Sequence, residues 1–279
     1  MLIHYHYLAE PEYQDKFRAV IQQLNCSPGV LSWIDGYLDR FTLRGNISVC
    51  LCTLAIHEPY RSRAITLYND IPLMPWVVLT DAPEDFANLN IRAIAHAATG
   101  PMAVDYLKKI RPTGDGRGAA AYHDKRFALM AALEDHDTAI FLDADSRISG
   151  VPRFDRFPGG LSVLPVVRRS VAEHLQVAGT WRLSAFEALA KHLTGSLDIL
   201  HRARWCQESC IAVTKDGRES IFFEMWGKAA EFMQDREVYS GEGGVIGLAA
   251  AMAGWTVDYE AVASFGSGIH HEAGGPKGG

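Results

Sequence analysis

Short apolar runs and amphipathic stretches alternate along the chain after residue 46. The apolar runs are rich in strand-forming residues, and the stretches between them carry apolar residues at helical spacing. Predicted strands span 47–55, 75–81, 91–97 and 138–142, and predicted helices span 59–71 and 122–137. Strands that alternate with helices predict an α/β fold, a mostly parallel sheet flanked by helices that binds ligands at the carboxyl ends of its strands.

The second half of the chain follows a less regular pattern. Its expected elements are a loop and strand within 151–167, a mainly helical 171–205, a strand over 208–216 closed by an Asp-Gly turn, helices over 218–237 and 240–254, and a last strand at 255–260. The helix over 218–237 carries an apolar stripe, which predicts a surface packed against the core. The stripe comprises Ile221, Phe222, Met225, Trp226, Ala229 and Phe232.

Residues 1–46 precede this alternation and are expected to form an N-terminal helical appendage. Apolar residues recur at helical spacing between Phe17 and Leu24, and a Ser-Pro-Gly sequence ends that helix. A second short helix is expected over 31–41. The main domain is then expected to span 47–279.

The composition is that of a globular protein, with 279 residues, of which 48% are hydrophobic and 22% charged. The net charge is -6 and no run of Lys or Arg occurs, so a nucleic-acid partner is not expected and the ligand is expected to be small or neutral. Five cysteines without a Cys-x-x-Cys pair favour reduced thiols, with Cys50 and Cys52 as core residues. No signal peptide or membrane span is expected, and the protein is expected to be soluble and cytoplasmic.

Two aspartates, Asp143 and Asp145, directly follow the apolar run at 138–142. Residues two apart in an extended chain point to the same side, so both carboxylates are expected to face one cleft. Close carboxylates repel each other unless a cation lies between them, and hard ions such as Mg2+ or Mn2+ take oxygen ligands. The pair indicates a metal-diphosphate anchor, and the alternative is an exposed acidic turn. Asp81 ends the strand at 75–81 and falls at the same edge of the sheet.

Four segments carry a further pattern in the order CTLAIHEPY, VVLTDAPEDF, HDKRFALMAALEDHDTAIFLDAD and GEGGVIGLAAAMAG. From about Ile47 to about His271 the chain resembles the glycosyltransferases of the GT-A type. The second and third segments look most like the retaining family that contains the blood-group transferases. The resemblance implies a GT-A-like, Rossmann-like fold. It also implies that a sugar moves from a nucleotide diphosphate, with a UDP-sugar favoured, to a hydroxyl of a saccharide or other acceptor, with Mn2+ or Mg2+ as cofactor.

The same resemblance implies roles for individual residues. Asp143 and Asp145 would hold the metal and the diphosphate, with Asp145 as the more direct metal ligand. Lys125 matches a basic position that contacts the nucleotide. The positions implied for the nucleotide site are Ala55, His57, Tyr60, Asp81, Lys125 and Asp143.

Two acids are candidates for catalysis. Glu242 would be a general base on the acceptor hydroxyl or a stabiliser of the oxocarbenium-like centre, and helix capping is its structural alternative. Glu208 lies where such folds present contacts to the donor sugar. Near the C-terminus, His271 and Lys277 fit a His-x-x-Gly-x-x-Lys spacing, which implies a metal ligand and a phosphate contact. An unstructured chain end is the alternative for that segment.

Three other classes share parts of this pattern. A phosphatase of the haloacid-dehalogenase type also ends a strand in Asp-x-Asp, but on its first strand and with the first Asp as nucleophile. A sugar-phosphate nucleotidyltransferase needs a glycine-rich phosphate loop after its first strand, and CTLAIHEPY has no glycine. A non-catalytic nucleotide-sugar-binding protein on the same scaffold would keep the metal site and lose catalysis.

Overall fold

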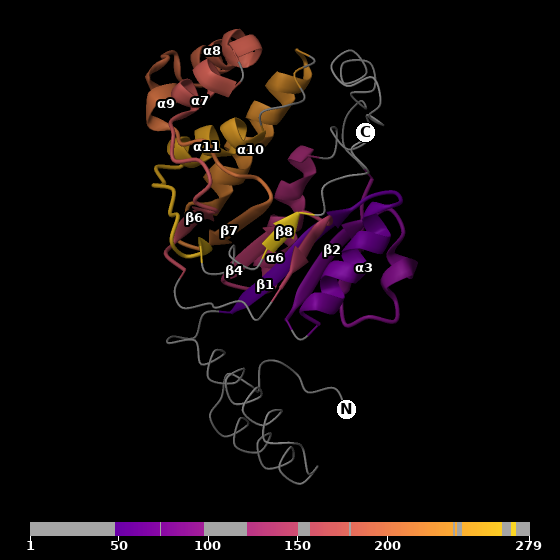
Figure 1. Ribbon diagram of the computed structural model, residues 1–279. Helices are drawn as coiled ribbons and strands as arrows, with labels where there is room; N and C mark the ends of the chain where they lie inside the picture. The colour runs from indigo at the N-terminus through magenta and orange to yellow at the C-terminus, as the bar shows by residue number, and fades with distance from the viewer. Residues whose placement is uncertain are drawn as a thin grey trace.

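The structure, a computed structural model, describes residues 48–72, 74–97, 122–149, 157–178, 180–236, 238, 242–263 and 269–271, with the backbone alone at 122, 270 and 271. Within these residues, six strands form a central sheet of order β3-β2-β1-β4-β7-β6 that is flanked by helices (Figure 1). The strands are β1 (Val49–Ala55), β2 (Trp76–Thr80), β3 (Arg92–Ala95), β4 (Thr138–Leu142), β6 (Gly160–Val163) and β7 (Cys210–Thr214).

The sheet is mostly parallel. Strands β3, β2, β1 and β4 run in the same direction, whereas β7 is antiparallel to both of its neighbours, β4 and β6. The four parallel strands therefore end together along one side of the sheet, which we call the carboxyl edge. The α/β class and the mostly parallel sheet predicted from the sequence are confirmed.

The strands bury side chains on both faces of the sheet, because successive residues point to opposite sides. On one face, Cys50 and Cys52 of β1 belong to a core cluster with α6 (Lys125–Asp135). On the other face, Leu51 packs in a second cluster with Leu67 of α3 (Tyr60–Asp70). The two cysteines are buried and unpaired, as expected for core residues.

The second half of the chain adds helices to the face that carries α6. Helix α10 (Glu219–Gln234) packs against α11 (Glu242–Met252) and also contacts α6. The expected helical region before β7 is divided into α7 (Val171–Ala178), α8 (Thr180–Thr194) and α9 (Asp198–Arg202). Single 3-10 turns, η2 (Pro83–Phe86) and η3 (Tyr122–Asp124), follow β2 and precede α6.

A short antiparallel ladder follows β4. Strand β5 (Ser146–Ile148) pairs with β8 (Ile269–His271), and Ser146 lies opposite His271. Arg147 of β5 binds the Asp70 carboxylate at the end of α3, with Nε 2.9 Å from Oδ2 and Nη2 2.8 Å from Oδ1. The ladder brings the backbone of His271 next to the segment that carries Asp145.

Two details of the predicted elements are wrong. Residues 255–260 form no strand but a single bridge, in which Asp258 N and O pair with Leu161 and Val163 of β6. In the predicted apolar stripe of α10, Phe222, Trp226, Ala229 and Phe232 are buried, whereas Ile221 is 45% exposed. The buried face is rotated around the helix relative to the stripe, because it also contains Phe223, Ala230 and Met233.

The expected appendage at 1–46 and Lys277 lie outside the described residues. In the part of the chain that the structure describes, no helix has the length and apolar character needed to cross a membrane.

Candidate functional site

Asp143 and Asp145 lie in the turn that joins β4 to β5. Asp143 N donates to Ser209 O at 3.1 Å, and Ser146 N donates back to Asp143 O at 2.9 Å, which closes the turn. The expectation of an extended backbone through the pair is therefore wrong, because the chain must reverse after Leu142 to enter β5. The carboxylates remain accessible at the carboxyl edge, with side chains 23% and 24% exposed.

Behind this turn, Lys125 lies at the centre of a cluster of charged side chains. It is the first residue of α6, and its Nζ lies 2.7 Å from Asp143 Oδ1 and 3.3 Å from Glu242 Oε2. The same ammonium donates to the backbone oxygen of Glu208 at 3.3 Å. The side chains of Lys125 and Glu242 are only 5% and 4% exposed. One cation therefore holds two carboxylates that lie far apart in the sequence.

Burial sets the protonation behaviour of this cluster. It raises the pKa of Glu242 well above the ordinary value of 4.5; Lys125 opposes the rise, while Glu208 and Asp143 add to it. Burial by itself would lower the pKa of Lys125, but Asp143, Glu242 and Glu208 raise it above its ordinary value. Lys125 thus stays charged at neutral pH. Among the described residues, Glu242 Oε1 is buried and has no hydrogen-bond partner.

Asp145 has a different counter-ion. Arg63 Nη1, from the first turn of α3, lies 4.0 Å from Asp145 Oδ2, and the arginine side chain is 26% exposed. Its guanidinium also lies over the ring of Tyr60, 5.8 Å from the ring centre. Each acid of the Asp-x-Asp pair therefore has its own cation, one buried and one partly exposed.

A second polar cluster joins the ends of β1 and β2. Asp81 accepts a hydrogen bond from His57 N at 3.1 Å and one from Arg61 Nη1 at 3.0 Å, and its other oxygen lies 2.8 Å from His57 Nδ1. Burial would raise the pKa of Asp81, but these donors lower it below its ordinary value. His57 has a φ of 63°, and this conformation turns its backbone N–H toward Asp81.

The two arginines of α3 were not among the residues expected from the sequence. Arg61 and Arg63 lie in the first turn of the helix that follows β1, so a βαβ reading already places them at the carboxyl edge. Their place just after β1 in a βαβ unit could have identified both arginines as candidate site residues. The sequence does not show that Arg61 contacts Asp81 while Arg63 contacts Asp145.

The other predicted site residues are spread around this edge. Ala55 is the buried last residue of β1, and Tyr60 is the half-buried first residue of α3. Glu208 approaches Lys125 through its backbone oxygen, and its side chain is half-buried. The backbone of His271 lies in β8, and the structure does not describe its side chain. Their roles remain predictions.

Close backbone packing positions Glu242 at the start of α11. A Cβ on Gly243 would lie 2.0 Å from Cys206 O, and one on Gly247 would lie 1.8 Å from Arg204 O. Only glycine allows the segment 204–206 to lie this close to the helix. Gly243 and Gly247 therefore serve packing between two backbone segments.

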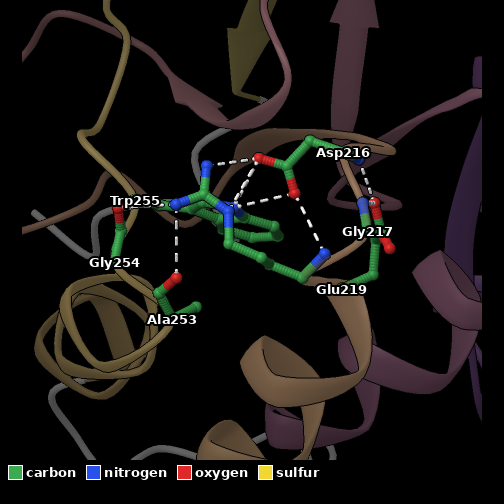
Figure 2. A network of polar contacts seen from close by, with 7 residues as sticks. Asp216, Gly217, Glu219, Ala253, Gly254 and Trp255 are labelled. Atoms are coloured by element: carbon green, nitrogen blue, oxygen red, sulfur yellow. Dashed lines mark hydrogen bonds and ion pairs between the residues drawn. The ribbon is translucent and has the colours of Figure 1, made fainter.

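The other end of α11 is fixed by a polar network (Figure 2). Arg218 Nη1 donates to Gly254 O at 2.9 Å, and Arg218 Nε donates to Asp216 Oδ2 at 3.1 Å. Trp255 Nε1 donates to the same carboxylate oxygen at 2.9 Å. The network links the turn before α10 to the end of α11, so the helix that carries Glu242 is held at both ends.

The site offers oxygen ligands for a hard divalent ion. Asp143 and Asp145 supply carboxylates of the type that Mg2+ and Mn2+ prefer, and neither is deeply buried. Within the described part of the chain, no group of three His, Cys, Asp or Glu side chains could hold a metal ion. Two ligands, with His271 expected as a third, are compatible with Mg2+, which usually keeps several waters and binds substrate phosphates.

The fold and the site define an α/β protein with a mostly parallel sheet and a site of mixed charge at its carboxyl edge. The sequence matches no protein-family profile and no curated protein. Among solved structures, the galactosyltransferase LgtC, in complex with donor and acceptor sugar analogues, aligns with 75% of this chain and 72% of its own, at 14% identity and a TM-score of 0.41. This distant similarity assigns no family, and the charges at the carboxyl edge are the basis for inferring function.

Proposed function

We propose that this protein is a glycosyltransferase that moves a sugar from a nucleotide diphosphate donor to an acceptor hydroxyl. A UDP-sugar is the favoured donor, and Mn2+ or Mg2+ held by Asp143 and Asp145 is the proposed cofactor. The observation that carries the proposal is the Lys125 cluster, in which one buried ammonium joins Asp143 at the end of β4 to Glu242 at the start of α11.

The charges at this edge suit a diphosphate bound together with a divalent ion. Two carboxylates alone would repel an anionic ligand, so an anion is expected to bind here only when a cation lies between them. Bound there, the ion would act as a Lewis acid that stabilises charge on the leaving diphosphate. Lys125 and Arg63 provide two further positive charges, and α6 begins at the same edge with the positive end of its dipole.

Lys125 holds Asp143 in a fixed position. Its side chain is almost fully buried and contacts three oxygen atoms from Asp143, Glu242 and Glu208, so its freedom to move is small. One oxygen of Asp143 is thereby occupied by the ammonium. We therefore expect Asp145 to be the more available ligand for a metal ion.

Glu242 is proposed to act through Lys125. A general base must come within about 3 Å of the acceptor hydroxyl, and a side chain that is 4% exposed offers little surface for that contact. Its contact with Lys125 instead helps to fix the ammonium against Asp143. Glu208 is proposed to contribute its backbone oxygen to the same arrangement, and a contact of its side chain with the donor sugar remains a prediction.

A thermal-shift panel tests the proposal. A ligand that binds only the folded protein raises the melting temperature by mass action. We expect UDP and UDP-sugars to raise it when Mn2+ is present and to have a much smaller effect in EDTA. If no nucleotide diphosphate shifts the melting temperature with Mn2+ or Mg2+, the proposal is wrong. Stable binding without transfer or slow hydrolysis of any donor would instead identify a non-catalytic binding protein.

A further inference from the structure

The two acids of the Asp-x-Asp turn are neutralised in different ways. Asp143 Oδ1 lies 2.7 Å from Lys125 Nζ, which is within hydrogen-bond distance, and the Lys125 side chain is buried. Asp145 lies 4.0 Å from Arg63 Nη1, too far for a hydrogen bond, and both side chains are about a quarter exposed. The first contact is fixed, whereas the second is a longer-range attraction between partly hydrated groups.

Lys125 has further partners that hold it in place, and Arg63 has few. Lys125 also contacts Glu242 and the backbone oxygen of Glu208. Within the described residues, Asp145 is the one carboxylate within 4.0 Å of the Arg63 guanidinium, whose other contact is with the ring of Tyr60. Moving Arg63 away from Asp145 therefore breaks no hydrogen bond between the two side chains.

We propose that Arg63 exchanges partners when the site fills: it is the counter-ion of Asp145 in the metal-free protein and contacts the diphosphate when metal and nucleotide are bound. This inference rests on the proposed function. A divalent ion and a guanidinium that share Asp145 repel each other, so a metal on Asp145 favours departure of Arg63. The guanidinium is planar and donates to phosphate oxygens in pairs, which makes an incoming diphosphate its natural partner.

The exchange predicts effects of opposite sign for one substitution. In Arg63→Met, Mn2+ alone should bind about fivefold more tightly, because a positive charge near the metal ligand is removed. UDP at saturating Mn2+ should bind about tenfold more weakly, because a charge-assisted contact to phosphate is lost. A residue that only supports the local structure would change both affinities in the same direction.

Two further variants complete the experiment. Arg63→Lys keeps the charge and should recover most of the UDP affinity and the wild-type Mn2+ affinity. Arg92→Met removes an arginine that pairs with Glu134 and Asp135 at the start of β3, the opposite side of the sheet from the carboxyl edge. Both affinities should be unchanged in this control. Calorimetric titration of the full chain, first with Mn2+ and then with UDP, measures each quantity.

The outcomes separate the inference from the proposed function. If the wild-type protein binds both Mn2+ and UDP, but Arg63→Met weakens both or alters neither, the exchange is wrong and the proposed function stands. If the wild-type protein binds neither ligand, the proposed function fails, and the exchange fails with it. Opposite shifts in Arg63→Met, absent in Arg92→Met, support the exchange.

Discussion

At the scale of single residues, the site depends on how three acids share two cations. Lys125 holds Asp143 and the buried Glu242, while Arg63 lies near Asp145. Because two carboxylates share one ammonium, the less exposed of them has the stronger tendency to take up a proton. Burial indeed raises the pKa of Glu242 well above 4.5. The protonation of Glu242 should therefore be visible in the stability of the protein.

Glu242→Gln should change how stability depends on pH. Above pH 4.5 the unfolded wild-type chain loses the Glu242 proton that the folded protein retains, so the wild type loses stability as pH rises toward the raised pKa of this group. Glutamine has no such proton. The free energy of unfolding of the variant should thus rise relative to the wild type, with a slope that approaches about 1.4 kcal/mol per pH unit.

Urea denaturation of both proteins at several pH values above 4.5 measures this difference. Glu224→Gln is a matched control, because Glu224 is 57% exposed and pairs with Lys228 on the surface of α10. The free energy of unfolding of Glu224→Gln should depend on pH in the same way as that of the wild type. If Glu242→Gln also shows the wild-type pH dependence, Glu242 is ionised in the folded protein.

At the scale of elements, the position of α11 determines where Glu242 lies. The helix contacts the segment 204–206 through Gly243 and Gly247, and Arg218 holds its other end. A helix rich in glycine has a low intrinsic tendency to form, so tertiary packing must stabilise it. Glycine lowers the helix propensity of α11, but it allows the two backbone segments to approach this closely.

Gly247→Ala should destabilise the protein by about 1 to 3 kcal/mol, the range for overpacking a core. The new Cβ would lie 1.8 Å from Arg204 O, so two backbone segments must separate. Gly227→Ala in α10 is the control, because its nearest neighbour would be Arg126 Nε at 3.8 Å. That change should be neutral or stabilise by up to about 1 kcal/mol. Urea denaturation compares them, and equal stability of the two variants would contradict the packing described for α11.

Elements with a strong local pattern were predictable from the sequence. Helix α6 has apolar residues at helical spacing and strand β4 is a continuous apolar run, and both lie within their predicted ranges. Strands β5 and β8 have three residues each and pair across a long stretch of chain, so neither carries a local signal. Residues 255–260 alternate as a strand would, but Trp255 is bound to Asp216 and only one bridge to β6 forms.

At the scale of the whole molecule, the alternation of strands and helices brings distant residues to one edge. Parallel strands joined by helices must end on the same side, so Asp81 and Asp143 could be placed together from the sequence. The sequence could not show which charges meet. Lys125 and Glu242 were both candidates, but their contact depends on how α11 packs against the α6 face, which no local pattern records.

The central claim is that Asp145 binds a divalent ion that in turn binds a nucleotide diphosphate. Calorimetric titration of UDP into wild-type protein and Asp145→Asn, with and without Mn2+, tests it most directly. Asp235→Asn is the control, since Asp235 is an exposed residue at the end of α10. We expect Mn2+-dependent binding in the wild type and the control, and its loss in Asp145→Asn at an unchanged melting temperature, because the site loses a charged oxygen ligand. Equal UDP affinity in Asp145→Asn, or wild-type binding that does not depend on Mn2+, would contradict the claim.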